Sequence, residues 1–377
     1  MPGKLRLPSP VKILIVFALL YTFLVGIKFI SISFGLFGSG FAEQLVTFYS
    51  NPFCGLFTGI LVTSLVQSSS ATTSLIVGLA GSGLLPLESA IPMVIGANMG
   101  STITSLLVSF TFITRKEDFR RAFTAATMHD FFNVFTILVF FPLEMFFHVI
   151  EKSALFLTDI FQNVGGIAFT NPIKMIIDPV TNGAQHLLLD TLGIGDVLAG
   201  IVLVIVAILI VIFSLVYLVK TMRLLVINTT EKAFDKFLFR NTFTAFTLGM
   251  LLTAVIQSSA VTVSMVVGLV AAGFLSLNRA YPFALGANIG TTITALIASL
   301  VTLNSESAAV GTIGLTVALS HLVFNIYGTL IFLPLRKVPI YCATKFGQFA
   351  SKSKVWAVGF VICGFYLVPL GLIFLTR

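Results

Sequence analysis

The sequence predicts an all-α polytopic membrane protein with two inverted-topology repeats, seven full spans, two re-entrant hairpins and two broken helices. Three observations lead to this prediction. Of the 377 residues, 57% are apolar and only 10% are charged, with a mean hydropathy of +1.06, whereas about a quarter of a soluble domain is charged. Seven apolar segments are long enough to cross a bilayer. A polar motif recurs in two related halves of the chain.

Each predicted span has at least 20 apolar-rich residues. At about 1.5 Å per residue, such a helix crosses the roughly 30 Å hydrocarbon core. The first span follows a basic N-terminus and is too long for a signal-peptide core, so we expect it to remain in the protein. The predicted spans are residues 12–34, 87–112, 119–148, 195–219, 277–302, 309–335 and 355–375.

Two further apolar stretches, 52–85 and 242–275, are each interrupted midway by a Gln-Ser-Ser cluster. Their arms of about 14 to 16 residues reach only about 21 to 24 Å as helices, which is too short to span. We therefore predict two re-entrant hairpins, which are stable only where protein or an aqueous cavity satisfies the interrupted backbone.

Basic residues gather in the N-terminus and in the stretches Arg115–Arg121, Lys220–Arg240 and Arg336–Lys354. Cytoplasmic connectors are enriched in Lys and Arg, so these stretches are predicted to lie inside. The residues 149–194 are poor in Lys and Arg and are predicted to form an outer loop. Seven crossings and two hairpins then place the N-terminus in the cytoplasm and the C-terminus outside.

The same composition excludes other classes of protein. The net charge of +8 lies in short connectors between apolar runs, so it reports orientation in a lipid bilayer and predicts no nucleic-acid partner. The cysteines Cys54, Cys342 and Cys363 are too few and too scattered for a disulfide scaffold or a Cys-based zinc site. We expect no cofactor.

An internal duplication relates the two halves. A shift of 190 residues aligns residues 67–109 with 257–299 at 22 identities in 43 positions, and a shift of 192 aligns His129, Asn133 and Pro142 with His321, Asn325 and Pro334. Inverted repeats with matching helix breaks are typical of secondary transporters. The predicted units are repeat 1 (12–148), the outer loop (149–194), repeat 2 (195–335) and a cytoplasmic connector with the last span (336–377).

The polar clusters have the chemistry of an ion site. A hairpin tip exposes backbone N–H groups at the start of its second arm, where the helix dipole favours an anion. Two opposed tips with serine hydroxyls can hold an oxyanion. Helix breaks at Gly96-Ala97-Asn98 and Gly286-Ala287-Asn288 are predicted to offer carbonyl, Asn and Thr oxygens to a small alkali cation. Close packing of small residues is the alternative reading of these clusters.

Asp130 is predicted to lie near the midplane, about nine residues beyond Arg121 at the inner interface. An intramembrane carboxylate is costly and is by default a functional candidate, here a cation ligand. The alternative is a structural pairing with His129 or His321. We expect both histidines to be buried, hydrogen-bonded supporting residues, with Asn133 and Asn325 either joining helices or supporting the site.

At these motifs the sequence resembles the type II sodium/phosphate cotransporter family, over nearly the whole chain from about residue 12 to 348. The residues that carry the resemblance are Gln67-Ser68-Ser69-Ser70, Gln257-Ser258-Ser259-Ala260, the two Gly-Ala-Asn motifs, Phe119-Arg120-Arg121-Ala122-Phe123, His129-Asp130-Phe131-Phe132-Asn133 and Tyr281-Pro282. Ala260 departs from the family motif and removes one hydroxyl. The outer loop lacks cysteine and Asn-x-Ser/Thr, as in a bacterial inner-membrane member.

The resemblance implies sodium-driven uptake of inorganic phosphate, with Na+ as the coupling ion and only metal. We expect this transport to be electrogenic and to use alternating access, as the inverted repeat suggests, and we consider a homodimer as one assembly state. The implied phosphate-binding residues are Gln67, Ser68, Ser69, Ser70, Gln257, Ser258 and Ser259. The implied sodium-binding residues are Gln67, Ser68, Asn98, Thr102, Asp130, Gln257, Ser258, Asn288, Thr291 and Thr292.

Other functions stay open at this point. A sodium-coupled carrier of another oxyanion or a phosphate exporter needs the same donors. An intramembrane hydrolase is a poorer fit, because a serine nucleophile needs a base and an oxyanion hole and no Gly-x-Ser-x-Gly motif is present. A passive channel would conduct without sodium coupling.

Overall fold

The computed structural model describes residues 8–37, 51–165, 172–230, 241–303 and 308–376, which are almost entirely helical and contain no strand. This confirms the predicted all-α class. The basic residues Lys4 and Arg6 and the end of the Lys220–Arg240 stretch lie outside the described residues.

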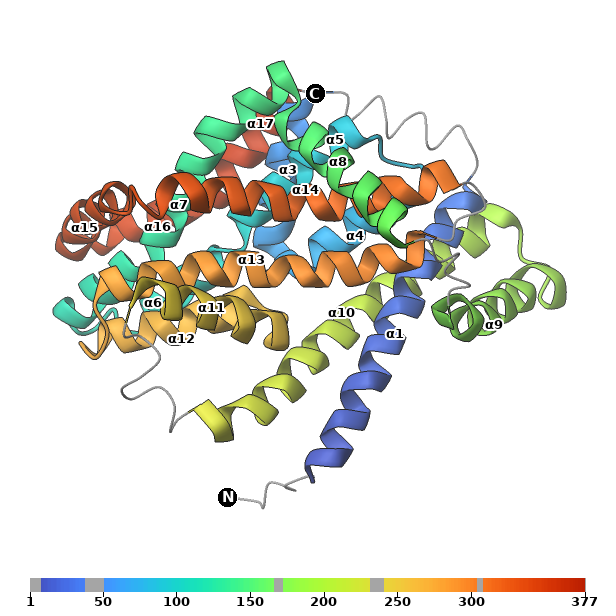
Figure 1. The fold of residues 1–377 in the computed structure, drawn as a ribbon, viewed down its shortest axis with the longest axis horizontal. Helices are drawn as coiled ribbons and strands as arrows, with labels where there is room; N and C mark the ends of the chain where they lie inside the picture. The colour runs from blue at the N-terminus through green and yellow to red at the C-terminus, as the bar shows by residue number, and fades with distance from the viewer. Residues whose placement is uncertain (1–7, 38–50, 166–171, 231–240, 304–307, 377) are drawn as a thin grey trace.

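Seven helical segments in the described residues are long and apolar enough to cross a membrane, which confirms the predicted spans and an integral, multi-pass membrane protein. They are Pro10–Ser33, Leu87–Phe110, Lys116–Phe147, Asp196–Thr221, Leu277–Thr302, Gly311–Phe332 and Lys354–Thr376. The first and fourth belong to α1 (Ser9–Leu36) and α10 (Asp196–Thr230), which pack side by side and stand obliquely to the remaining bundle (Figure 1).

Both predicted hairpins are present. The first consists of α3 (Pro52–Val66) and α4 (Ser69–Gly81), and the second of α11 (Thr242–Ile256) and α12 (Ser259–Ala271). Each arm has only 13 to 15 residues, so neither hairpin arm spans a bilayer alone. The polar cluster forms the turn in both hairpins.

The predicted helix breaks at the two Gly-Ala-Asn motifs are wrong. In the first copy, α5 (Leu87–Gly100) is helical through this motif, and the helix is interrupted later, before α6 (Ile103–Phe110). In the second copy, α13 (Leu277–Thr302) is unbroken. Both motifs therefore lie in helices. The Asn98 carbonyl is close to the interruption in the first copy and accepts hydrogen bonds from the Ser101 hydroxyl at 2.8 Å and from the Asn133 amide at 3.4 Å.

The glycines of these motifs serve close packing instead. A Cβ on Gly96 would clash with the Leu56 carbonyl of α3, and a Cβ on Gly286 would clash with the Phe246 carbonyl of α11. Small residues allow membrane helices to approach at backbone distance, where dispersion contacts and weak hydrogen bonds hold them. Each hairpin's first arm is thereby packed tightly against the span that follows it.

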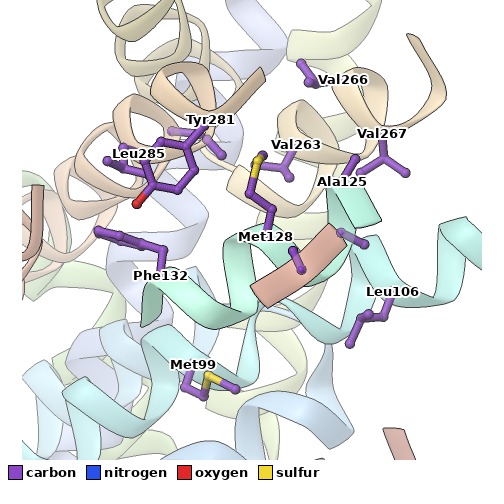
Figure 2. Packing of buried hydrophobic residues seen from close by; sticks show 14 of the residues in the cluster. Met99, Leu106, Ala125, Met128, Phe132, Val263, Val266, Val267, Tyr281 and Leu285 are labelled. Carbon is purple, nitrogen blue, oxygen red and sulfur yellow. The ribbon is translucent and has the colours of Figure 1, made fainter. Parts of the chain in front are cut away.

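The second arm of each hairpin crosses to the other half of the chain. Helix α4 packs against α13 and α14 (Ala308–Phe332), while α12 packs against α6 and α7 (Lys116–Phe147). Figure 2 shows this second contact, with Met128 of α7 beside Val263 of α12. Phe132 on α7 meets Tyr281 on α13 edge to face, with the ring centroids 6.2 Å apart.

The remaining helices lie outside the two hairpins. The predicted outer loop contains α8 (Val149–Gly165), α9 (Pro172–His186) and the short π-helix η1 (Leu187–Thr191), so the described part of this region is largely helical. Between the last two spans lies α15 (Lys337–Lys352). The final span consists of α16 (Lys354–Ile362), the π-helical η2 (Cys363–Leu367) and α17 (Val368–Thr376).

Candidate functional site

The two hairpin tips have the same backbone geometry. Gln67 and Gln257 end the first arms in the left-handed conformation, with φ of 56° and 58°. Ser68 and Ser258 follow in extended conformation, and each side-chain oxygen accepts a hydrogen bond from an N–H in the first turn of the second arm. Because the hydroxyl proton is not used in this cap, each of these serines keeps a donor for a ligand.

The tips are in direct contact. The Ser70 hydroxyl donates to the backbone carbonyl of Gln257 at 3.0 Å, across 187 residues of sequence. The predicted phosphate residues therefore come together at one place. The two tips are not equivalent, however, because Gln257 is buried while Gln67 is exposed.

Next to the tips, buried asparagine and histidine side chains join the two halves. Nε2 of His129 lies 2.7 Å from Oδ1 of Asn288, and Nε2 of His321 lies 3.2 Å from Oδ1 of Asn98. These two contacts are equivalent under the internal duplication, and each pairs a histidine of one half with an asparagine of the other. The repeat thus predicts the residues but not the exchange between halves.

The amide groups extend this network. Asn98 donates to Asn133 at 3.1 Å and to Asn325 at 3.2 Å, and Asn288 donates to Asn133 at 3.0 Å. All four asparagines are at most 1% exposed. Buried amides that are mutually hydrogen-bonded fix one arrangement of helices. His129, His321, Asn133 and Asn325 are thus buried and hydrogen-bonded, and their role in supporting a site stays a prediction.

Asn98 and Asn288, predicted as sodium ligands, both direct their side-chain oxygens toward histidine nitrogens. An amide oxygen has two lone pairs, so the Asn288 oxygen keeps one that a cation could contact. The Asn98 oxygen also accepts from the Asn325 amide at 3.4 Å, so a cation there would have to displace a hydrogen bond. Their role as sodium ligands stays a prediction.

Asp130 is 1% exposed and lies inside the long helix α7. Thr102 is beside it, but the Thr102 hydroxyl donates to the Met99 carbonyl at 2.8 Å. Neither carboxylate oxygen has a hydrogen-bond partner among the described residues. The structural pairing with His129 or His321 is therefore not formed, and the carboxylate has an unused coordination capacity that a cation can fill.

Other buried hydroxyls near the duplicated motifs are also without a partner in the described part of the chain. Thr291, a predicted sodium ligand, has one of them, whereas Thr292 donates to the Ile289 carbonyl at 2.7 Å. Four further hydroxyls of this kind were not predicted from the sequence. They form two pairs of repeat-related residues, which the 190-residue shift could have identified: Ser74 with Ser264 and Thr104 with Thr294.

The sequence profile described as Na+/Pi-cotransporter matches residues 22–169 and 209–377, which together are most of the chain. The chain belongs to the Na+/Pi-cotransporter family. This confirms the resemblance carried by the two Gln-Ser-Ser motifs. In this Na+/Pi-cotransporter family member, the matched segments include both hairpins and all of the asparagine–histidine network.

Several relatives of this family member are similar over 95% of the chain. Sodium-dependent phosphate transport protein 2A of Rattus norvegicus is 30% identical over 428 residues, and sodium-dependent phosphate transport protein 2B of Homo sapiens is 28% identical over 448 residues. The chain spans 66% and 64% of the length of these two proteins. No solved structure matches the chain.

Proposed function

We propose that this protein is a secondary active transporter that couples inward sodium movement to the uptake of inorganic phosphate. The observation that carries the proposal is the contact between the two repeat-related hairpin tips, made by Ser70 and the Gln257 carbonyl. It brings two helix N-termini and their serine hydroxyls to one point. The printed names of the relatives, which describe sodium-dependent phosphate transport, support the same conclusion.

The phosphate would be held by backbone N–H groups and serine hydroxyls, without a basic side chain. The nearest Lys or Arg residues in the sequence on either side of the first tip are Lys28 and Arg115. Charge neutralisation then has to come from cations that travel with the anion. The unpaired Asp130 carboxylate and the free Thr291 hydroxyl are hard oxygen ligands suited to Na+. This requirement is the physical reason for sodium coupling.

The charged ends of the spans support one orientation in the membrane. The start of α7, next to Arg115 and Lys116, packs against α15 in the basic stretch 336–354, and these charges support a cytoplasmic assignment for this end of the bundle. The N-terminal end of α1 would then be cytoplasmic and α17 would end outside. A bacterial inner membrane and a homodimer remain predictions for this family member.

Alternating access would move the hairpins and the spans packed on them against α1 and α10. Those two helices pack along each other, stand obliquely to the bundle and contact it through α4, α11 and α13 (Figure 1). Both are almost wholly apolar in sequence, which suits a scaffold along which a site slides. An intramembrane hydrolase is disfavoured, because His129 faces Asn288 and not a serine.

The test is uptake of labelled phosphate into proteoliposomes with defined sodium gradients. Ser68→Ala and Ser259→Ala should each weaken the apparent phosphate affinity roughly ten- to a hundredfold, since a hydrogen bond to a charged oxygen contributes about 1.5 to 3 kcal/mol. The controls are Ser109→Ala and Ser299→Ala, whose hydroxyls donate to carbonyls of their own helices.

Unchanged affinity in both tip variants would refute the site. Sulfate and arsenate as competitors distinguish phosphate from other oxyanions. Flux that persists without a sodium gradient and follows the phosphate gradient alone would identify a channel, and accumulation only in the outward direction would identify an exporter.

A further inference from the structure

A separate cavity of about 160 Å³ lies at the far end of the second hairpin, where α7, α12, α13 and α15 meet. Its wall includes Val270, which is 11 residues beyond Ser259 and therefore about 16 Å along α12 from the hairpin tip. The proposed transport site and this cavity are thus distinct. The lining residues are Arg120, Arg121, Thr124, Val270, Leu277, Thr344 and Gln348.

The lining offers the N–H donors of Arg120, Arg121 and Gln348 and includes no acidic side chain. The hydroxyls of Thr124 and Thr344 donate to the carbonyls of Arg120 and Ile340 in their own helices, each at 2.7 Å. Nε of Arg120 is buried and has no hydrogen-bond partner among the described residues. A buried guanidinium N–H without an acceptor is costly, so an acceptor is expected to enter the cavity.

The charge balance favours an anion. Arg120 forms an ion pair with Glu117 at 2.6 Å, but both side chains are substantially exposed, so the pair is weak. The other nearby acid, Asp118, pairs with Arg115 at 3.6 Å. Arg121 is exposed and forms no ion pair within the described chain.

The cavity lies at the end of the bundle where two candidate membrane spans begin. The spans Lys116–Phe147 and Leu277–Thr302 both begin here, with Arg120 and Arg121 in the second turn of one and Leu277 at the start of the other. Helix α15 covers this edge and approaches α7 closely, since a Cβ on Gly347 would clash with the Thr124 hydroxyl.

Helix α15 has the composition of a helix that lies on a membrane surface. The stretch 336–354 contains five basic residues and no acidic one. Tyr341 and Phe349 are exposed, and so is Trp356 just beyond it, with Phe349 and Trp356 in ring contact at 5.3 Å. Basic residues with exposed aromatics are typical of interfacial helices on anionic lipid.

We propose that this cavity binds the phosphate group of an anionic phospholipid from the adjacent leaflet. Nε of Arg120, the guanidinium of Arg121 and the amide of Gln348 would donate to the phosphate oxygens. One water needs only about 10–15 Å³, so the cavity has room for a tetrahedral group. Because Val270 and Leu277 flank the connection from α12 to α13, the bound lipid would fasten the base of the second hairpin to α7 and α15.

The experiment is native mass spectrometry of the full-length protein, titrated with phosphatidylglycerol and, as the neutral comparison, phosphatidylcholine. Wild type should retain phosphatidylglycerol selectively. Arg120→Gln and Arg121→Gln should each weaken this binding about fivefold, the factor equivalent to about 1 kcal/mol per basic residue at an anionic surface. Gln348→Leu should weaken it without any change of charge.

The controls are Lys345→Gln and Lys352→Gln, which remove charge from α15 but do not line the cavity. If they weaken binding as much as the arginine variants and Gln348→Leu has no effect, the attraction is diffuse and the proposal is overturned. Elution as a single species shows that a variant is folded, and Arg121→Lys provides a second variant that keeps the charge but loses the planar donor pair.

A further arm separates lipid from free anion. Inorganic phosphate at millimolar concentration is added to delipidated wild type and Arg121→Gln, and thermal unfolding is recorded. No difference between the two proteins agrees with a lipid site. Stabilisation of the wild type alone, with displacement of phosphatidylglycerol, would assign the cavity to inorganic phosphate and overturn the lipid assignment.

Discussion

Nε2 of His129 lies 2.7 Å from Oδ1 of Asn288, although 159 residues separate them in the chain. The repeat-related pair, His321 with Asn98, has the same contact at 3.2 Å. Both pairs are buried between helices of different halves. The two halves are therefore joined by reciprocal polar contacts at the centre of the bundle.

The first prediction concerns this coupling. His129→Ala and Asn288→Ala should each lower the free energy of unfolding by about 1–3 kcal/mol, because each leaves a buried polar partner unsatisfied. The double variant should lose less than the sum, with an interaction energy of about 0.5–3 kcal/mol. Thermal unfolding in detergent measures these values. Thr22→Val, which removes an exposed bond to the Ala18 carbonyl, should change little, and strict additivity would contradict the contact.

The second prediction concerns the glycine at the α11–α13 contact. Gly286→Ala should destabilise the protein by about 1–3 kcal/mol, because the added methyl group clashes with the Phe246 carbonyl. Gly268→Ala in the second hairpin is the matched control, since its Cβ would have no neighbour within 4 Å. It should stabilise the helix by about 0.5–1 kcal/mol. Equal effects of the two changes would mean that α11 and α13 are less closely packed than described.

The third prediction concerns Asp130. If its unpaired carboxylate holds an additional sodium ion, Asp130→Asn should leave phosphate uptake detectable but remove its dependence on membrane potential. For divalent phosphate, two sodium ions move no net charge and a third moves one, which is worth about 2.3 kcal/mol per 100 mV. Uptake into proteoliposomes clamped with potassium and valinomycin provides the measurement. Asp118→Asn, in the exposed pair with Arg115, should keep the voltage response; a wild type that ignores the clamp would exclude this role.

The fourth prediction concerns motion of the first hairpin against α1. A Cβ on Gly78 would lie 3.5 Å from the Ile27 side chain, so a Gly78→Cys and Ile27→Cys pair in a background without native cysteines should form a disulfide. Gly78→Cys with Phe23→Cys, about one helical turn away, should also crosslink if the hairpin slides. Crosslinking is followed under opposite sodium and phosphate gradients. Formation of the first bond alone under every gradient would argue for a fixed site depth.

Much of this fold could be predicted because the bilayer restricts the choices. The lengths and apolar composition of the spans identify them, and polar Gln67 and Gln257 in otherwise apolar segments mark the hairpin turns. The Gly-Ala-Asn motifs were misread because glycine beside asparagine is compatible with an unwound helix and with a closely packed one. Only the neighbouring carbonyls of Leu56 and Phe246 decide between them.

The sequence indicated which residues are candidates for the site, but it did not indicate which of them contact each other. The duplication identified His129 and Asn288 as members of matched sets. Their contact requires the second arm of each hairpin to cross between halves, and no local pattern in the sequence encodes that crossing. The unpaired state of Asp130 was likewise undetermined, because it depends on the direction in which the Thr102 hydroxyl points.

The crossing of α4 onto α13 and α14, and of α12 onto α6 and α7, also affects how the chain can fold. A domain buries its core within its own sequence, but here each half would leave one hairpin arm and one histidine without their packing partners. The first half, synthesised alone, should therefore be unable to complete its packing until the second half is present. In folding, the two halves are therefore expected to behave like the two subunits of an obligate dimer that are joined in one polypeptide.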